Sequence, residues 1–360
     1  MRCKMYPAEM QFRMPPEWAV HMRTFIEWPV RASMCWPDNY DELCRGYAQA
    51  ARAVARFEPV TMLVNPEDMN QAARLCGSVV ELAEIPHNDS WVRDNGPTFV
   101  ISHSGRIAGI NWRFNAWGGR YLPCDLDDAV PARLLEREQI QAFNAPIVLE
   151  GGSVHVDGEG SLLTTQECLL NPNRNPGMTR EEITAALKQY LGIETVIWLN
   201  KGLDGDETDG HIDNAACFVR PGMVLLQVCN DPNDPNYEIT RENLGIMQKA
   251  VDARGRKLEI IQIPQPFPEY YMGKRLTLSY INFYFVNGGI VLPLFGGKSR
   301  ETDEIARQTF KDLFPGRKIV TIDGMPLVKE GGNVHCITQQ MPLAGGPVGQ
   351  LIADSPERTS

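Results

Sequence analysis

The chain has 360 residues, of which 43% are apolar and 22% charged, a composition typical of a globular protein with a large core. Its formal net charge of −10 argues against nucleic acid or an anionic membrane surface as a partner and favours a cationic ligand. No stretch approaches the roughly 20 apolar residues of a membrane span, and the start of the sequence lacks the apolar core of a signal peptide. The nine cysteines are scattered and contain no CxxC pair, so we expect a reducing cytoplasm without a disulfide framework or zinc ribbon.

Short apolar runs and amphipathic segments follow one another irregularly along the chain. We predict, in order, a helix over 39–56, a strand over 60–64, a helix within 66–76, strands over 98–101, 147–149 and 161–164, a helix over 179–191, strands over 195–199, 215–219 and 224–228, a helix over 240–252, strands over 258–263, 283–286 and 290–293, a helix over 300–314 and a strand over 318–322. Thr179 and Glu182 have the spacing of a capping box. Strands outnumber helices about two to one, which suits a repeating unit of several strands plus a helix.

One short sequence occurs twice. EGGSVHV at residues 150–156 matches EGGNVHC at residues 330–336 in five of seven positions. Two copies separated by half the chain are typical of a pseudo-symmetric fold, although a common Glu-Gly-Gly turn could also match by chance. The copies differ at their last position, where the first has Val156 and the second has Cys336.

Polar residues concentrate in four stretches beside predicted strands, at residues 87–97, 149–160, 205–218 and 330–340. Cys336 in the last stretch is a candidate nucleophile. In an extended chain its neighbour His335 would point to the opposite face, which disfavours His335 as the acid/base partner. His211 and Asp213 are two residues apart, so an extended segment would present an imidazole and a carboxylate on one side.

Together these stretches place five residues in Gly-rich turns, which we expect to meet in one cleft. They are Asp94, Glu150, His211, Asp213 and Cys336. Each His or Cys alone could equally be a buried core residue that makes its hydrogen bonds within the protein and has no role in function. Three carboxylates disfavour a thiolate and cannot stabilise an oxyanion, which argues against amide hydrolysis of the papain kind. A guanidinium, in contrast, offers N–H donors to paired carboxylates, and its charge would favour the thiolate.

A metal site is the rival interpretation of the acidic stretch at residues 204–215. Its sixth position is Asp209 and its twelfth is Ala215, where an EF-hand loop requires Gly and Glu. Zinc-binding Cys and His spacings are absent from the sequence. We therefore predict no metal and no organic cofactor.

At these residues the sequence resembles the agmatine deiminase family, within the wider guanidino-group-modifying superfamily. The matching stretches are RMPPEW, NDSWVRDNGP, FNAWGG, LEGGSVHVDGEGSLLTTQECLLNPNRNP, ETDGHIDNAACF, SYINFYFVNGGIVLP and GGNVHCITQQMP, which together run from residue 13 to 342. The resemblance implies an α/β fold, a five-bladed β/α propeller (pentein) with pseudo-fivefold symmetry, formed as a single guanidine-deiminase domain over residues 1–360.

The resemblance also assigns roles to individual residues. Cys336 is implied as the nucleophile, and His211 as the general acid/base. Asp94 and Asp213 are implied as the carboxylates that hold the guanidinium, and Glu150 as a further carboxylate of the site. The expected substrate-binding residues beyond these are Trp91 and Glu207, the latter being the candidate for the amine end of the substrate.

The implied activity is hydrolysis of agmatine to N-carbamoylputrescine and ammonia, through a covalent thiouronium on Cys336. Its expected partner is a small cationic guanidine, with neither nucleic acid nor membrane, and the resemblance leaves a cytoplasmic homodimer possible. Two alternatives remain open from the sequence. The chain could deiminate another guanidine, such as peptidylarginine or arginine, or it could be a non-catalytic protein that binds a guanidine or a polyamine.

Overall fold

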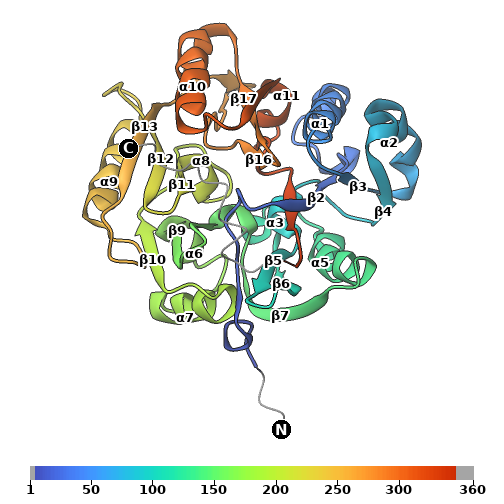
Figure 1. Cartoon of the computed structure of the whole chain (residues 1–360). Coiled ribbons are helices and arrows are strands. Elements are labelled where there is room, and N and C mark those ends of the chain that lie inside the picture. The colour runs from blue at the N-terminus through green and yellow to red at the C-terminus, as the bar shows by residue number, and fades with distance from the viewer. Residues whose placement is uncertain (1–4, 346–360) are drawn as a thin grey trace.

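Five β-sheets repeat one pattern of strand pairing in the computed structural model, which describes residues 5–345 (Figure 1). In each sheet a strand pairs antiparallel with the next, and that strand pairs parallel with a third. The three strands are β19 (Gln339–Pro342), β2 (His21–Glu27) and β3 (Val60–Val64) in one sheet; β5 (Thr98–Ser102), β6 (Ile107–Arg113) and β7 (Gln141–Val148) in the next; β8 (His155–Val156), β9 (Ser161–Thr165) and β10 (Thr195–Leu199); β11 (Ala216–Arg220), β12 (Met223–Val228) and β13 (Glu259–Pro264); and β16 (Tyr284–Val286), β17 (Gly289–Leu294) and β18 (Lys318–Asp323).

Three further pairings complete the sheets. Strand β4 (Glu81–Glu84) extends the sheet of β3, and β1 (Phe12–Arg13) pairs with β5. Strands β14 (Tyr270–Tyr271) and β15 (Lys274–Arg275) form a separate hairpin.

A helix connects the two parallel strands of every repeated unit, because parallel neighbours require a crossover of a dozen or more residues. These connecting helices are α1 (Tyr40–Val54), α5 (Asp125–Arg137), α7 (Arg180–Leu191), α9 (Asn236–Lys249) and α10 (Arg300–Leu313). In Figure 1 they lie outside the sheets, as does α2 (Met69–Cys76), while the short helices α3 (Val92–Asn95), α6 (Gln166–Leu169) and α8 (Ile212–Ala215) lie nearer the middle of the view. The remaining short helices are α4 (Ala116–Gly119) and α11 (Met325–Val328).

The predicted elements agree with the structure where their apolar pattern was strong. The helix predicted over 179–191 is α7, and Thr179 and Glu182 form its capping box as predicted. Helix α9 begins four residues earlier than predicted, after Pro235. The strand predicted at 147–149 is the end of β7, whose first four residues, QAFN, alternate in no regular way and are largely exposed. Helix α5 was missed, because Pro131 interrupts a helical pattern that opens with acidic residues.

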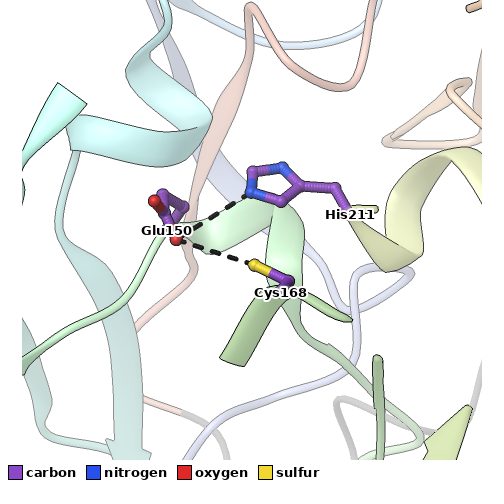
Figure 2. A group of neighbouring side chains, drawn as sticks. All are labelled: Glu150, Cys168 and His211. Atoms are coloured by element: carbon purple, nitrogen blue, oxygen red, sulfur yellow. Dashed lines mark hydrogen bonds and ion pairs between the residues drawn. The ribbon is translucent and has the colours of Figure 1, made fainter. Parts of the chain in front are cut away.

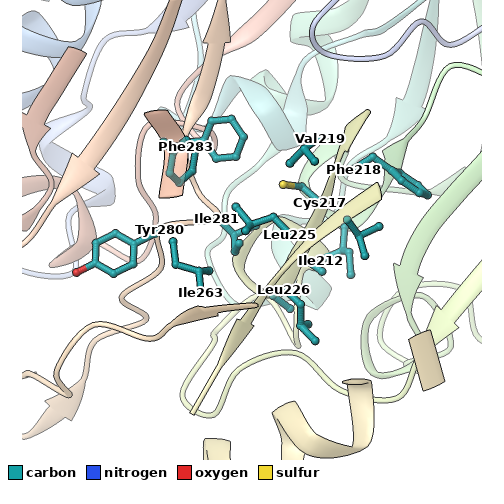
Figure 3. Packing of buried hydrophobic residues seen from close by; sticks show 14 of the residues in the cluster. Ile212, Cys217, Phe218, Val219, Leu225, Leu226, Ile263, Tyr280, Ile281 and Phe283 are labelled. Atoms are coloured by element: carbon teal, nitrogen blue, oxygen red, sulfur yellow. The ribbon is translucent and has the colours of Figure 1, made fainter. Parts of the chain in front are cut away.

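Apolar packing fixes the short helix α8 in place. Ile212 is fully buried, and it belongs to a cluster that includes Phe218 from β11 and Leu225 from β12 (Figure 3). Burying a side chain of this size stabilises the fold by about 1.5–3 kcal/mol. Ile212 thereby anchors the chain between His211 and Asp213, the two polar residues that flank it.

Within residues 5–345, none of the helices combines the length and the apolar character that crossing a membrane would require.

Candidate active site

One-turn helices and tight turns carry the polar residues singled out from the sequence. Asp94 lies on α3, Asp213 lies on α8 and His211 is the residue before α8. Glu150 precedes the 3-10 turn at Gly151–Ser153, and Cys336 lies in a turn before β19. The expectation that all five lie in turns is therefore wrong for Asp94 and Asp213. The extended geometry assumed for residues 211–213 and 335–336 does not hold either, because Asp213 is helical and His335 and Cys336 lie in a turn. A single helical turn is too short to show a period in the sequence.

At the second glycine of each repeated heptapeptide, side chains of the site approach the backbone closely. A Cβ on Gly152 would lie 2.7 Å from Nδ1 of His211 and 2.9 Å from a carboxylate oxygen of both Asp94 and Asp213. A Cβ on Gly332 would lie 3.0 Å from Sγ of Cys336 and 2.5 Å from the ring of Trp91. Close approach of side chains to bare backbone explains why both copies need glycine here.

Asp94 is buried and accepts two hydrogen bonds. The indole Nε1 of Trp117 donates to Oδ2 at 2.9 Å, and the backbone N–H of Gly152 donates to Oδ1 at 2.9 Å. Burial raises the pKa of Asp94; His211 counteracts this, while Asp213 and Glu150 reinforce it. These bonds orient the carboxylate toward the same space that His211 and Cys336 border.

The Cys336 thiol lies between an amide and a carboxylate. Nδ2 of Asn282 donates to Sγ at 3.0 Å, and Sγ donates to Oδ2 of Asp213 at 3.4 Å. Burial, with added repulsion from Asp213 and Asp94, raises the pKa of the thiol well above its ordinary value. The free site therefore holds Cys336 as a thiol, and a cation bound beside it would favour the thiolate.

His211 is fully buried, and neither ring nitrogen has a hydrogen-bond partner among the described residues. Nδ1 lies 3.7 Å from Oδ1 of Asp94, and Nε2 lies 3.9 Å from Oε2 of Glu150 (Figure 2). Burial disfavours the imidazolium, but Asp94, Cys168 and Glu150 outweigh burial and raise the pKa of His211 well above its ordinary value. The imidazole is thus charged and poised to donate a proton.

Glu150, Cys168 and His211 form the one group in the described chain whose donor atoms could hold a metal ion, since these atoms lie within 4.8 Å of one another. Sγ of Cys168 is 4.0 Å from Oε2 of Glu150 (Figure 2). Nε of Arg174, however, donates to Oε1 of Glu150 at 2.6 Å, so a guanidinium already balances this carboxylate. The neighbouring cation and the charged His211 disfavour a metal at this group.

A pocket leads from the surface to Cys336. Its lining includes Trp91, Asp94, Trp117, Tyr121, Glu207 and Glu330. Glu207 lies near the mouth, where its Oε2 accepts from the hydroxyl of Tyr121 at 2.7 Å and its Oε1 lies 2.5 Å from Nζ of Lys274. The structure therefore places Trp91 and Glu207 in the same pocket as Asp94 and Cys336, while Glu150, His211 and Asp213 lie directly behind it.

Residues 13–342 match the family model described as Porphyromonas-type peptidyl-arginine deiminase. The chain belongs to this family. Agmatine deiminase of Stutzerimonas stutzeri is 43% identical, with 93% of this chain and 97% of that protein covered. Agmatine deiminase of Pseudomonas savastanoi pv. phaseolicola is 45% identical, with 92% and 95% covered.

Solved structures of family relatives are also similar. Agmatine deiminase of Enterococcus faecalis superposes with a TM-score of 0.90 at 35% identity, covering 95% of this chain and 98% of that one. A Campylobacter jejuni agmatine deiminase variant with substrate bound gives a TM-score of 0.84 at 28% identity, covering 93% and 97%. DDAH of Pseudomonas aeruginosa, at 14% identity and a TM-score of 0.50, shares the mixed α/β fold alone.

Several residues of the site were missed from the sequence. They are Trp117, Cys168, Arg174 and Asn282, all buried against the predicted residues. Each lies within a stretch that resembles the family, but a single Trp, Cys, Arg or Asn that belongs to no spaced pattern gives no signal of a role. Their contacts arise between segments far apart in the chain, such as Asn282 with Cys336.

Proposed function

We propose that this chain hydrolyses the guanidinium of agmatine, forming N-carbamoylputrescine and ammonia through a covalent intermediate on Cys336. The observation that carries the proposal is a buried thiol in contact with Asp213, in an acidic pocket that Asp94 also lines. Oδ1 of Asp213 has no hydrogen-bond partner within the described residues, which leaves a buried carboxylate oxygen available to a cationic ligand.

The proposed first half-reaction uses Cys336 and His211. A guanidinium held by Asp94 and Asp213 brings positive charge next to Sγ and lowers the pKa of the thiol, and Asn282 donates a hydrogen bond to the resulting thiolate. The thiol loses its proton to solvent through the pocket, and the thiolate attacks the guanidinium carbon. His211 donates its proton to the departing amino group, which leaves as ammonia, and a thiouronium remains on Cys336.

In the proposed second half-reaction, His211 is neutral and takes a proton from water. The water oxygen adds to the carbon of the thiouronium, and collapse of this adduct breaks the carbon–sulfur bond. The hydroxyl proton of the adduct passes to the departing thiolate, which regenerates the Cys336 thiol, and the neutral ureido product leaves. Glu150 would support both steps, because its carboxylate faces Nε2 of His211 and stabilises the charged imidazole.

The mouth of the pocket supports an amine-ended substrate. Among the lining residues, all within the described part of the chain, none is Arg or Lys, as a substrate carboxylate would require. Glu207 is the proposed partner of the amine, and Trp91 packs beside the reacting end. Lys274 already pairs with Glu207, so the substrate amine would replace an existing cation there.

The decisive assay measures ureido product from agmatine, free arginine and a blocked arginine peptide. Agmatine should be the preferred substrate. If free arginine or the arginine peptide is preferred, the proposed activity changes to arginine deiminase or peptidylarginine deiminase. Cys336→Ala should release no ammonia while its melting temperature stays near that of the wild type, whereas turnover by this variant would refute the assignment. A non-catalytic guanidine- or polyamine-binding protein would show no turnover and no covalent labelling of Cys336 by a haloacetamidine.

We also propose that the five repeated units form a five-bladed propeller with pseudo-fivefold symmetry, as a single domain over residues 1–360. Their common strand pairing and crossover helix support this arrangement. The family resemblance supports a cytoplasmic enzyme and leaves a homodimer as the assembly to test by sedimentation.

A further inference from the structure

Glu17 connects the two copies of the repeated heptapeptide. It lies between β1 and β2 and is 3% exposed. Its Oε1 is 2.8 Å from Nε2 of His335, and its Oε2 is 3.6 Å from Nε2 of His155. These histidines occupy the same position in the two copies. One buried carboxylate thus contacts both, although only His335 continues to the site.

His335 is a bridge between two carboxylates. Its Nε2 faces Glu17, and its Nδ1 lies 2.8 Å from Oδ2 of Asp213. Both ring nitrogens therefore meet an acceptor, and only the imidazolium can donate to both at once. Backbone contacts fix the bridge, because Nε of Arg93 donates to the carbonyl of His335 at 3.2 Å and the Arg93 N–H donates to that of Cys336 at 3.2 Å.

The bridge occupies one oxygen of Asp213 and leaves the other free. Oδ2 accepts from His335 and from the thiol of Cys336, whereas Oδ1 is buried without a hydrogen-bond partner among the described residues. A carboxylate that is held at one oxygen cannot rotate freely about its Cβ–Cγ bond. The free oxygen is therefore presented in a fixed direction.

We propose that Glu17 and His335 are positioning residues that hold Asp213 at Oδ2, so that Oδ1 is oriented and charged to receive the substrate guanidinium. This inference rests on the proposed function, because it concerns the carboxylate that would grip the guanidinium. Neither residue touches the reacting atoms. His335 acts through Asp213, and Glu17 acts through His335.

The charges around the bridge favour its ionised form. Asp213 faces His335, His211, Cys336 and Asp94, while His335 also faces Arg93. Burial and Arg93 oppose the imidazolium, but Glu17 and Asp213 outweigh them and raise the pKa of His335. Burial opposes ionisation of Asp213, yet the hydrogen bond and charge of His335 hold the pKa of Asp213 below its ordinary value.

Burial raises the pKa of Glu17, but His335 and Arg93 outweigh burial and, together with the contact to His155, hold this pKa well below the ordinary value. Removing this negative charge lowers the pKa of His335. The imidazolium that supports Asp213 is then lost at a lower pH, so the alkaline limb of the pH profile moves downward.

The test compares Glu17→Gln with His155→Gln, a matched control that alters the other histidine on Glu17 without reaching Asp213. Agmatine turnover is measured from pH 5 to 9, about the range over which His and thiol groups titrate. We expect Glu17→Gln to lower kcat/KM by about ten- to hundredfold, mainly through KM, and to shift the alkaline limb downward. His155→Gln should leave the limb in place. A uniform loss at every pH, or an equal shift in both variants, would overturn the proposal.

Binding provides an arm that does not depend on turnover. Agmatine affinity is measured by calorimetry in Cys336→Ala and in Cys336→Ala with Glu17→Gln, and we expect weaker binding in the double variant by about the same factor as the change in KM. Equal affinities would overturn the inference. Agmatine turnover by the wild type is measured separately. If the wild type shows no turnover, the proposed function fails, whatever the outcome for Glu17. If Glu17→Gln does not fold, His335→Gln replaces it in both arms, since it keeps a donor to Asp213 but removes the charge.

Discussion

Gly152→Ala would test the geometry of the site most directly. The new Cβ would lie 2.7 Å from Nδ1 of His211 and 2.9 Å from oxygens of Asp94 and Asp213, where ordinary contacts begin at 3.4 Å. The three side chains would have to retreat by about 0.5–0.7 Å, the difference between these distances. Displacement on this scale at reacting groups costs on the order of 10²-fold in rate, or about 2.7 kcal/mol.

We therefore expect Gly152→Ala to lower kcat/KM for agmatine by about 10²-fold. Overpacking of the buried site should also cost about 1–3 kcal/mol of stability. Ureido product formation and thermal unfolding measure the two effects. The control is Gly245→Ala on α9, which has open space around its Cβ position and should be neutral or stabilising by about 0.5–1 kcal/mol. Wild-type kcat/KM in Gly152→Ala would refute the convergence of His211, Asp94 and Asp213 on this glycine.

Two further predictions concern the thiol and the mouth of the pocket. Asn282→Ala removes the hydrogen bond to Sγ that favours the thiolate, so the pKa of Cys336 should rise further and iodoacetamide alkylation should require a higher pH than in the wild type; an unchanged pH dependence would contradict this role. Lys274→Ala removes the cation that pairs with Glu207, so the KM for agmatine should fall or stay within about fivefold, the range expected of a partly exposed ion pair, and agmatine should gain over arginine. A large rise in the agmatine KM would instead assign Lys274 to substrate binding.

The chemical groups of the site could be predicted from the sequence, but their local conformation could not. Cys336, His211, Asp94 and Glu150 were singled out because thiol, imidazole and carboxylates lie in polar stretches beside strands, and the structure brings all four together. Period-based prediction nevertheless failed at Asp94, because a one-turn helix has no measurable period. His335 was disfavoured as the acid/base partner of Cys336 on the assumption of an extended chain, whereas the residue lies in a turn.

Long-range contacts explain what else the sequence concealed. Asn282 reaches Sγ of Cys336 across 54 positions, and Glu17 reaches His335 across 318. A local sequence pattern does not indicate a contact between residues so far apart in the chain. Helix α7 was predicted almost to the residue because its capping box and apolar face are local. The largely exposed first half of β7, in contrast, is ordered by pairing with β6 and contains no continuous apolar run.

The pairing of β19 with β2 ties the position of Cys336 to a distant part of the chain. Gln339 and Gln340 of β19 pair with Phe25 and Thr24 of β2. Cys336 lies three residues before β19, so the turn that carries its thiol adjoins a strand that is ordered by this long-range pairing. Contacts between segments so far apart in sequence form late, because the entropy of closing the loop between them is lost before the contacts stabilise the chain. We therefore expect the thiol to reach its place in the site in one of the last steps of folding.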